Sequence, residues 1–163
     1  MFVLARAVTY AALFIGFFLV YLPARILERA GIQAPPAWGP AQVVGGIATA
    51  AGLLLAVACV VAFALAGRGT PAPFDPPRRL VVRGPYARVR NPMYLGAWLA
   101  LTGAALHFRS AALLLFALGF IAATVAFVHL YEEPALRRRF GAEYEAYRAA
   151  VGRWWPRRRG HTP

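Results

Sequence analysis

An uncharged apolar run of membrane-spanning length is the feature that most constrains how this chain folds. Residues 43–66 contain no Asp, Glu, Lys or Arg, and about 20 predominantly apolar residues suffice to cross the hydrocarbon core of a bilayer. Pro40 precedes the run and Gly67 follows it, and both residue types punctuate helices. The run therefore predicts a transmembrane helix.

Three further apolar runs cover residues 7–22, 92–108 and 110–131. The first could instead be a signal peptide, but no small-x-small cleavage site follows it cleanly, so we interpret it as a helix that ends at Pro23. The last two are separated by a link so short that it forces an antiparallel hairpin.

The composition supports a membrane protein. Hydrophobic residues make up 60% of the 163 residues, above the roughly 45–50% of soluble domains, and a soluble core of this size cannot bury so much apolar surface. We predict an all-α integral membrane protein with one domain, residues 1–163, about four transmembrane helices and a C-terminal amphipathic helix.

The distribution of arginine predicts the orientation. The net charge is +12 and every basic residue is Arg. Four crossings would put the two arginine-rich segments, residues 67–91 and 132–163, on one side. Only Arg25, Arg29 and Arg109 would remain for the other. The positive-inside rule then predicts a multi-pass protein with both termini in the cytoplasm. Because the arginines flank apolar runs, we predict no nucleic-acid partner.

Several kinds of chemistry lack a basis in the sequence. Cys59 stands alone, and His107, His129 and His161 have no metal-ligand spacing, so we predict no metal and no internal disulfide. There is no strand pattern and no Gly-x-Gly-x-x-Gly motif, which excludes a sheet-based nucleotide-binding fold.

Two segments are unusual for a passive membrane bundle. In the first, Asn91 and Pro92 suit the start of a helix, as cap and first residue. The same helix start would present free N–H groups to an anion or polar ligand, with Tyr86 and Tyr94 as flat surfaces for a purine.

The second unusual segment is Glu132-Glu133-Pro134. Pro134 is expected to end the fourth helix, so that the acids open the next helix, where the dipole favours negative charge. Alternatively, they bind a cation. In the tail, apolar positions recur at helical spacing on one face, at Leu136, Phe140, Tyr144, Tyr147 and Val151. By pattern alone, this is a surface helix lying on lipid.

Taken in order, these segments resemble the membrane methyltransferases that include isoprenylcysteine carboxyl methyltransferase and the phospholipid N-methyltransferases. The pieces are Gly84-Pro85-Tyr86, Arg90-Asn91-Pro92-Met93-Tyr94-Leu95-Gly96, Glu132-Glu133, a Phe-Gly-x-x-Tyr-x-x-Tyr stretch from Phe140 to Tyr147, and Pro156. The resemblance covers about residues 78–156.

The resemblance implies an S-adenosylmethionine site on the cytoplasmic face, formed by residues 67–91 and 132–163 with the helix starts between them. A lipid or lipidated substrate would enter from the bilayer. The implied cofactor-binding residues are Arg79, Leu80, Val81, Tyr86, Arg90, Asn91, Pro92, Met93, Tyr94, Gly96, Glu132, Glu133, Tyr144 and Tyr147.

Three functions remain open. The first is a methyltransferase for an isoprenylcysteine-type or other lipophilic acceptor. The second is a phospholipid N-methyltransferase of the phosphatidylethanolamine type. The third is a non-enzymatic basic membrane protein that binds anionic lipid. A carboxylate acceptor needs no base, whereas an amine acceptor must lose a proton, for which Glu133 or His129 is the candidate catalytic residue.

Overall fold

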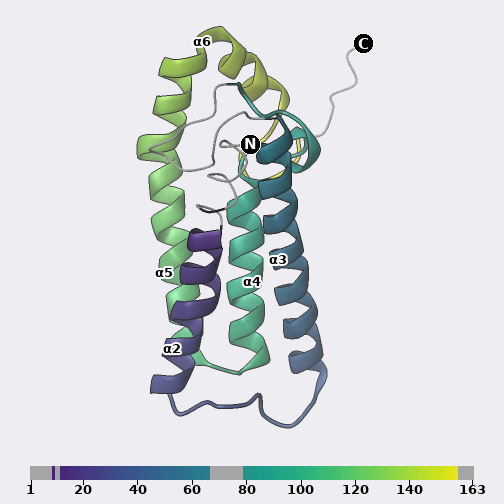
Figure 1. The fold of residues 1–163 in the computed structure, drawn as a ribbon, viewed down its shortest axis with the longest axis vertical. Helices are drawn as coiled ribbons and strands as arrows, with labels where there is room; N and C mark the ends of the chain where they lie inside the picture. Colours follow the sequence, from purple (N-terminus) through teal and green to yellow (C-terminus); the bar gives the residue numbers. More distant parts are fainter. Residues whose placement is uncertain (1–8, 10–11, 67–78, 158–163) are drawn as a thin grey trace.

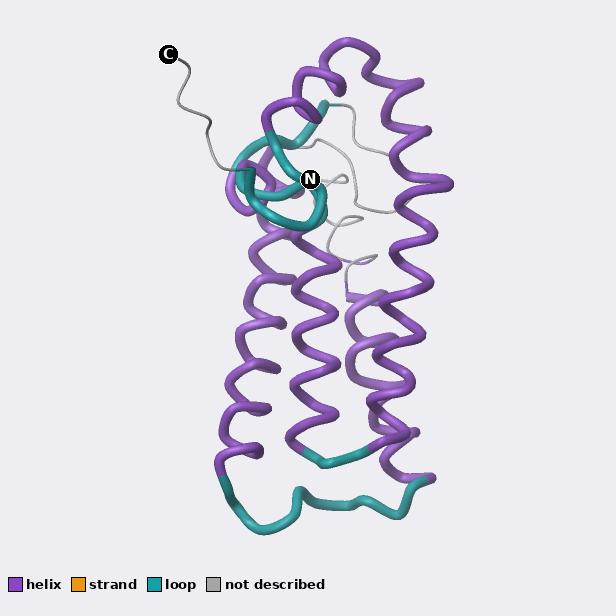
Figure 2. Tube along the Cα trace, turned by 180° about the vertical axis from the view of Figure 1, so that it is seen from behind, coloured by secondary structure: helices purple, strands orange, loops and turns teal. Residues whose placement is uncertain are grey.

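The protein was analysed as a computed structural model that describes residue 9 and residues 12–66 and 79–157. The start of the first predicted run, residues 67–78 of the basic linker and residues 158–163 of the tail lie outside the described residues. Within the described ranges every regular element is a helix, and the one extended pairing is an isolated bridge between Val89 and Gly152 (Figure 2). The all-helical prediction is confirmed.

Helices α2, α3, α4 and α5 run along the long axis, and α6 bends over one end (Figure 1). We call that end, where α3 finishes and α4 begins, the α6 end; the opposite end, with the α4–α5 link, is the hairpin end. Ser110 caps α5 by accepting a hydrogen bond from the Leu113 N–H at 3.2 Å. The bounds are Leu22–Arg29 for α2, Pro40–Ala66 for α3, Pro92–His107 for α4, Ala111–Phe127 for α5 and Glu133–Ala150 for α6.

Glycines let α3 and α4 pack with their backbones almost in contact. A Cβ at Gly52 would lie 2.4 Å from the Ala100 nitrogen, and one at Gly103 would lie 2.6 Å from the Thr49 nitrogen. Small residues permit this approach where lipid provides no hydrophobic drive between helices. Gly96 belongs to the same seam, because its Cβ would lie 2.8 Å from the Gly52 carbonyl oxygen.

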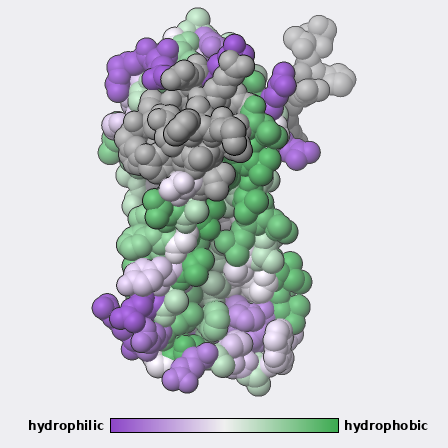
Figure 3. All heavy atoms as spheres, viewed as in Figure 1, coloured by the Kyte–Doolittle hydropathy of each residue, from purple (hydrophilic) through white to green (hydrophobic). Residues whose placement is uncertain are grey.

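The bundle exposes its apolar side chains. Ile47 and Leu54 of α3 and Leu115 of α5 are 65–70% exposed, and Figure 3 shows a hydrophobic band between two hydrophilic ends. Two helices, Pro40–Phe63 and Ala111–Ala150, are long and apolar enough to cross a membrane. Helix α4 has 16 residues, or about 24 Å. The expectation of about four crossings therefore stays a prediction.

Two prolines that were expected to end helices do not, so that part of the prediction is wrong. A π-helical segment, Ile15–Tyr21, precedes Pro23, and another, Val128–Glu132, precedes Pro134. The Glu133 N–H bonds to the Val128 carbonyl five residues back. Pro134 has no N–H, and its ring would crowd the preceding turn of a regular α-helix. The wider π-helical turn shifts the hydrogen-bond register just before Pro134, so the chain continues directly into α6.

The tail forms the expected helix, but α6 is not straight. Gly141 interrupts it with φ +49° and ψ −122°, a conformation that glycine adopts without a Cβ clash. The bend lets the second half of α6 fold over the start of α4 (Figure 1), and Tyr144 becomes 1% exposed. The second half is therefore part of the packed structure.

Candidate active site at the α6 end

The turn before α4 packs onto the end of α3. Gly84, at φ +61°, begins a short 3-10 helix, Gly84–Ala87. This helix buries Tyr86 beside Cys59 and Val81, with Met93 packed against them. The Tyr86 ring meets Phe63 edge-on with ring centroids 5.1 Å apart. Three predicted site residues, Val81, Tyr86 and Met93, thus share one apolar cluster that fixes the turn.

The start of α4 has no side-chain cap. Asn91 precedes Pro92, but its side chain makes no cap hydrogen bond; its amide nitrogen donates to the Arg153 carbonyl at 3.3 Å. The expectation that Asn91 caps this helix is therefore wrong: its side chain is held toward the tail through the amide nitrogen, and its oxygen accepts no hydrogen bond from the first turn of α4. The first N–H groups of a helix have no partner within the helix and carry its positive dipole end.

Glu132 faces the start of α4. The Tyr94 hydroxyl donates to its carboxylate at 3.1 Å, and among the described residues no arginine forms an ion pair with it. Burial raises the pKa of Glu132 to about 7; the hydrogen bond from Tyr94 opposes the rise and the charge of Glu133 adds to it. This carboxylate lacks a cationic partner in the described structure.

Glu133 has the opposite environment. Arg90 Nη2 donates to Glu133 Oε1 at 2.8 Å, and Arg153 Nε and Nη2 reach the two carboxylate oxygens at 2.8 and 2.6 Å. Burial alone would raise the pKa of Glu133, but the hydrogen bonds and charges of Arg153 and Arg90 outweigh it and lower the pKa to about 2. Glu133 is therefore a paired anion, with both oxygens engaged.

The tail after α6 is held against this cluster. Arg90 uses its backbone N–H to reach the Gly152 carbonyl at 2.8 Å, and its Nη1 donates to the Val151 carbonyl at 2.9 Å. The Tyr147 hydroxyl donates to the Tyr86 carbonyl at 2.7 Å. Turn, helix start and tail are thus joined by hydrogen bonds between residues about 60 positions apart.

Trp154 anchors the tail lower on the bundle. Its ring lies against Trp98 of α4 with centroids 4.5 Å apart, and the Trp98 indole N–H donates to the Thr124 hydroxyl of α5 at 2.9 Å. Arg153, one residue earlier, also donates from Nη1 to His129 Nε2 at 2.6 Å. The tail therefore bridges α4 and the end of α5.

The sequence-predicted residues divide into groups. Arg90, Asn91, Tyr94, Glu132 and Glu133 converge at the α6 end, with Tyr147 tied to the turn. Gly96 instead faces α3. Arg79 is exposed and Leu80 half-buried at the start of the described turn, and His129 is exposed beside Arg153.

Arg153 was missed by the sequence reasoning. The sequence carries 18 basic residues, and nothing in their pattern selects the one that pairs with Glu133. The sequence signal nearest to it is the break in the tail: the helical spacing stops after Ala150, and Trp154, Trp155 and Pro156 favour an extended segment.

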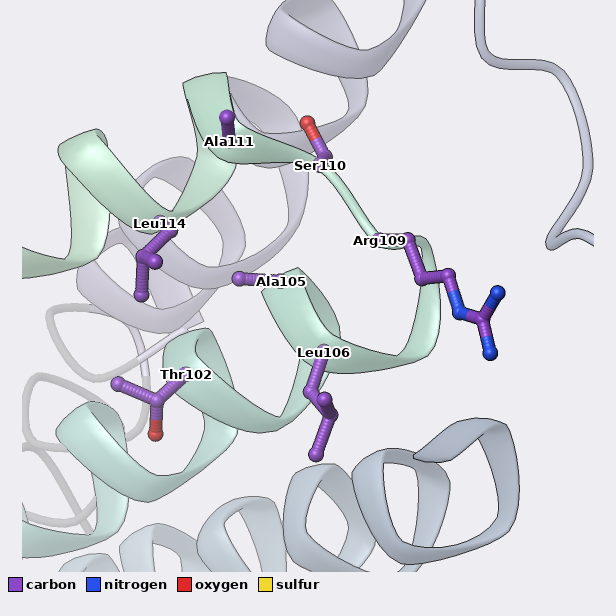
Figure 4. Close-up of a pocket in the computed structure, with 7 residues that line it drawn as sticks. All are labelled: Thr102, Ala105, Leu106, Arg109, Ser110, Ala111 and Leu114. Carbon is purple, nitrogen blue, oxygen red and sulfur yellow. The ribbon is translucent and has the colours of Figure 1, made fainter. Parts of the chain in front are cut away.

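A hollow lies at the hairpin end, between α4 and α5. It has a volume of about 290 Å³ and is lined mainly by small and apolar side chains, while the Arg109 guanidinium points away from it (Figure 4). It shares no residue with the Arg90–Glu133 cluster. Its lining is Thr102, Ala105, Leu106, Arg109, Ser110, Ala111 and Leu114.

Comparison with known proteins bears on what the α6 end does. Neither a curated protein nor a solved structure matches the chain. A family model described as phospholipid methyltransferase matches residues 40–143, from the first residue of α3 into α6. The match includes Arg90, Tyr94, Glu132 and Glu133 and stops before Arg153. Because it spans more than half of the chain, the protein belongs to the phospholipid methyltransferase family.

Proposed function

We propose that this protein is an integral membrane enzyme that transfers a methyl group from S-adenosylmethionine to a lipid acceptor at the α6 end of the bundle. The observation that carries the proposal is Glu132: a half-buried carboxylate without a described cationic partner, hydrogen-bonded to Tyr94 at the uncapped start of α4. Family membership supplies the reaction class.

The distribution of charge supports a cytoplasmic α6 end. Arg83 and Arg90 precede α4, and Arg137, Arg148 and Arg153 follow α5, all at this end; Arg25, Arg29 and Arg109 lie toward the hairpin end. Under the positive-inside rule this arrangement favours four crossings with both termini in the cytoplasm. The proposed spans remain residues 7–22, 43–66, 92–108 and 110–131.

The residues present suit S-adenosylmethionine. Its positive charges need a carboxylate, which Glu132 offers, and its carboxylate suits the free N–H groups where Pro92 begins α4. Tyr94 would keep the Glu132 carboxylate in place. The further walls of the proposed site come from the turn, the first residues of α4 and the second half of α6; they are Arg79, Leu80, Val81, Tyr86, Met93, Tyr144 and Tyr147.

When bound, this cofactor supplies an electrophilic methyl group with a good leaving group. The protein then mainly aligns donor and acceptor and excludes water. Glu133 holds Arg90 and Arg153, and through them the tail, over the site. Since its carboxylate is charged and engaged by both arginines, we assign Glu133 to positioning, and Glu132 becomes the better proton acceptor for an amine substrate. His129 stays a second candidate.

Two acceptor classes fit this site, a prenylcysteine-type carboxylate and a phospholipid amine, and the family description favours the second. The test is incubation of detergent-purified protein with methyl-labelled cofactor and a total lipid extract. We expect label in the lipid fraction, as a base-labile ester in the first case and as a methylated head group in the second. If neither product is labelled and the protein binds no cofactor, the methyltransferase proposal fails and the third function, a non-enzymatic basic protein that binds anionic lipid, is supported instead.

A further inference from the structure

The cluster around Glu133 is open on one side only, at Arg153. The Arg90 and Glu133 side chains are 8% and 6% exposed, whereas Arg153 is 27% exposed. Arg153 uses Nε and Nη2 for Glu133 and Nη1 for His129. A guanidinium has five N–H donors, so one N–H on each terminal nitrogen remains available to a ligand on the exposed side.

The cluster also carries excess positive charge. Two guanidinium groups, Arg90 and Arg153, share the single carboxylate of Glu133, which leaves one positive charge uncompensated within it. Because Arg90 is buried, the excess is accessible at Arg153. A half-exposed guanidinium whose plane is fixed by a bidentate carboxylate is suited to bind a phosphate or carboxylate oxygen pair.

Apolar surface adjoins this charge. His129, which contacts Arg153, is followed by Leu130, which is 81% exposed. On the other side of Arg153 in the chain, Trp154 packs on Trp98, and Trp155 is 81% exposed. Exposed leucine and tryptophan beside a cation fit a ligand with an acyl chain below an anionic group, which is the chemistry of a phospholipid at the membrane interface.

We propose that Arg153, oriented by Glu133 and His129, binds the phosphate of the acceptor lipid and so selects phosphate-bearing acceptors. This inference rests on the proposed methyl transfer and deepens it. It assigns acceptor recognition to a tail residue outside the part of the chain that matches the family model. Glu132 faces the start of α4, whereas Arg153 is held by the neighbouring Glu133, so the lipid phosphate would lie beside the methyl-transfer site.

The experiment compares two acceptors in detergent micelles, a short-chain phosphatidylethanolamine and a primary alkylamine of similar chain length without phosphate. Binding is followed by the intrinsic tryptophan fluorescence of the protein, and methyl transfer by labelled cofactor. In Arg153→Gln we expect the dissociation constant and KM for the phospholipid to rise about tenfold more than those for the alkylamine, the loss of one charged contact to phosphate. Arg153→Lys keeps the positive charge but lacks the planar guanidinium, so its dissociation constant and KM for the phospholipid should lie between those of the wild type and of Arg153→Gln.

Arg139→Gln is the matched control, because Arg139 is exposed on α6 and contacts only the Phe140 ring among the interactions described for it; it should behave as wild type. Equal weakening for both acceptors, or none for either, would overturn the phosphate assignment. If Arg153→Gln does not fold, the deciding quantity is the ratio of the KM for the phospholipid to the KM for the alkylamine in Arg153→Lys: a ratio raised above that of wild type supports the proposal, and an unchanged ratio overturns it. Calorimetry with S-adenosylmethionine keeps the two proposals apart: bound cofactor with no acceptor preference rejects this inference alone, and no bound cofactor rejects the methyl transfer.

Discussion

The α3–α4 seam and the α6 end are built on opposite principles. In the seam, backbones meet at Gly45, Gly52, Gly96 and Gly103, and an added Cβ would overlap backbone atoms of the partner helix. At the α6 end, long charged side chains hold segments that are far apart in the chain. The difference teaches that the seam is fixed by close backbone packing, whereas the α6 end is held by hydrogen bonds and ion pairs of individual side chains.

The largest expected effect tests the seam. In Gly52→Leu the new side chain must displace backbone that would lie 2.4 Å from its Cβ. Overpacking typically costs about 1–3 kcal/mol, and we expect this variant at or above the upper end because backbone has to move. We expect a protein that fails to fold or unfolds at a much lower temperature, measured by circular dichroism in detergent. Gly119→Ala is the control, since nothing lies within 4 Å of that position. Equal stability of both variants would contradict the close seam.

The next effect tests the ion-pair cluster. Glu133→Gln leaves Arg90 and Arg153 facing each other, and breaking a buried pair costs about 3 kcal/mol. The pKa of Glu133 is lowered to about 2 in the folded protein, below its unfolded value near 4.3. Its stabilisation is therefore complete above pH 4.3 and is lost as the pH falls through about 2.

Thermal unfolding over that pH range measures this loss, which Glu133→Gln should abolish. Glu145→Gln is the matched control, because Glu145 pairs with Arg137 and Arg148 while 52% exposed, and exposed pairs contribute about 0–1 kcal/mol. A Glu133 variant no less stable than this control would show that the cluster holds nothing in place.

An effect of similar size and opposite sign concerns Glu132. Its pKa is raised to about 7 in the folded protein, so between about pH 4.3 and 7 the folded state binds more protons than the unfolded state. Stability should therefore fall as the pH rises through this window, by about 3 kcal/mol, and Glu132→Gln should remove the fall. If the stability of the wild type, measured by thermal unfolding without cofactor, does not change with pH in this window, the account of Glu132 as a half-buried and unpaired carboxylate is contradicted.

The smallest effect is that of Tyr94→Phe. It removes one hydrogen bond to Glu132 at a cost of about 1 kcal/mol. Because that bond lowers the pKa of Glu132, the variant should titrate at higher pH, measured as a displaced pH dependence of cofactor affinity. An unchanged midpoint would show that Tyr94 does not hold this carboxylate.

Much of the bundle was predictable because hydrophobic length and helix punctuation are local properties. The uncharged run 43–66 and the predicted helix start at Pro92 correspond to α3 and α4 within a few residues. The same local rules gave wrong predictions at two places, Pro134 and Gly141. Pro134 was expected to stop a helix, but the π-helical turn before it absorbs the misfit, and Gly141 bends α6 where spacing alone predicts a straight face.

The candidate site was predictable only where its residues carry a motif. The ordered motifs predicted one site formed by the segment before and at the start of α4 together with Glu132 and Glu133. The individual contacts, Tyr94 to Glu132 and Arg90 to Glu133, come from the structure. The different environments of Glu132 and Glu133 could not be predicted. Two identical residues that are neighbours in the sequence differ only in which side chains the fold places beside them. Arg153 lies 20 positions from Glu133, and pairing at that range is set by tertiary packing around the bent α6.

Cofactor binding tests the central claim most directly. Isothermal titration of detergent-purified protein with S-adenosylmethionine should show binding at pH 8 that weakens as the pH falls below about 7, where Glu132 takes up a proton. Glu132→Gln should bind at least tenfold more weakly at pH 8 and lose the pH dependence, whereas Arg139→Gln should match wild type. Binding of equal strength in the Glu132 variant, or none in the wild type, would contradict a cofactor site between α4 and the end of α5.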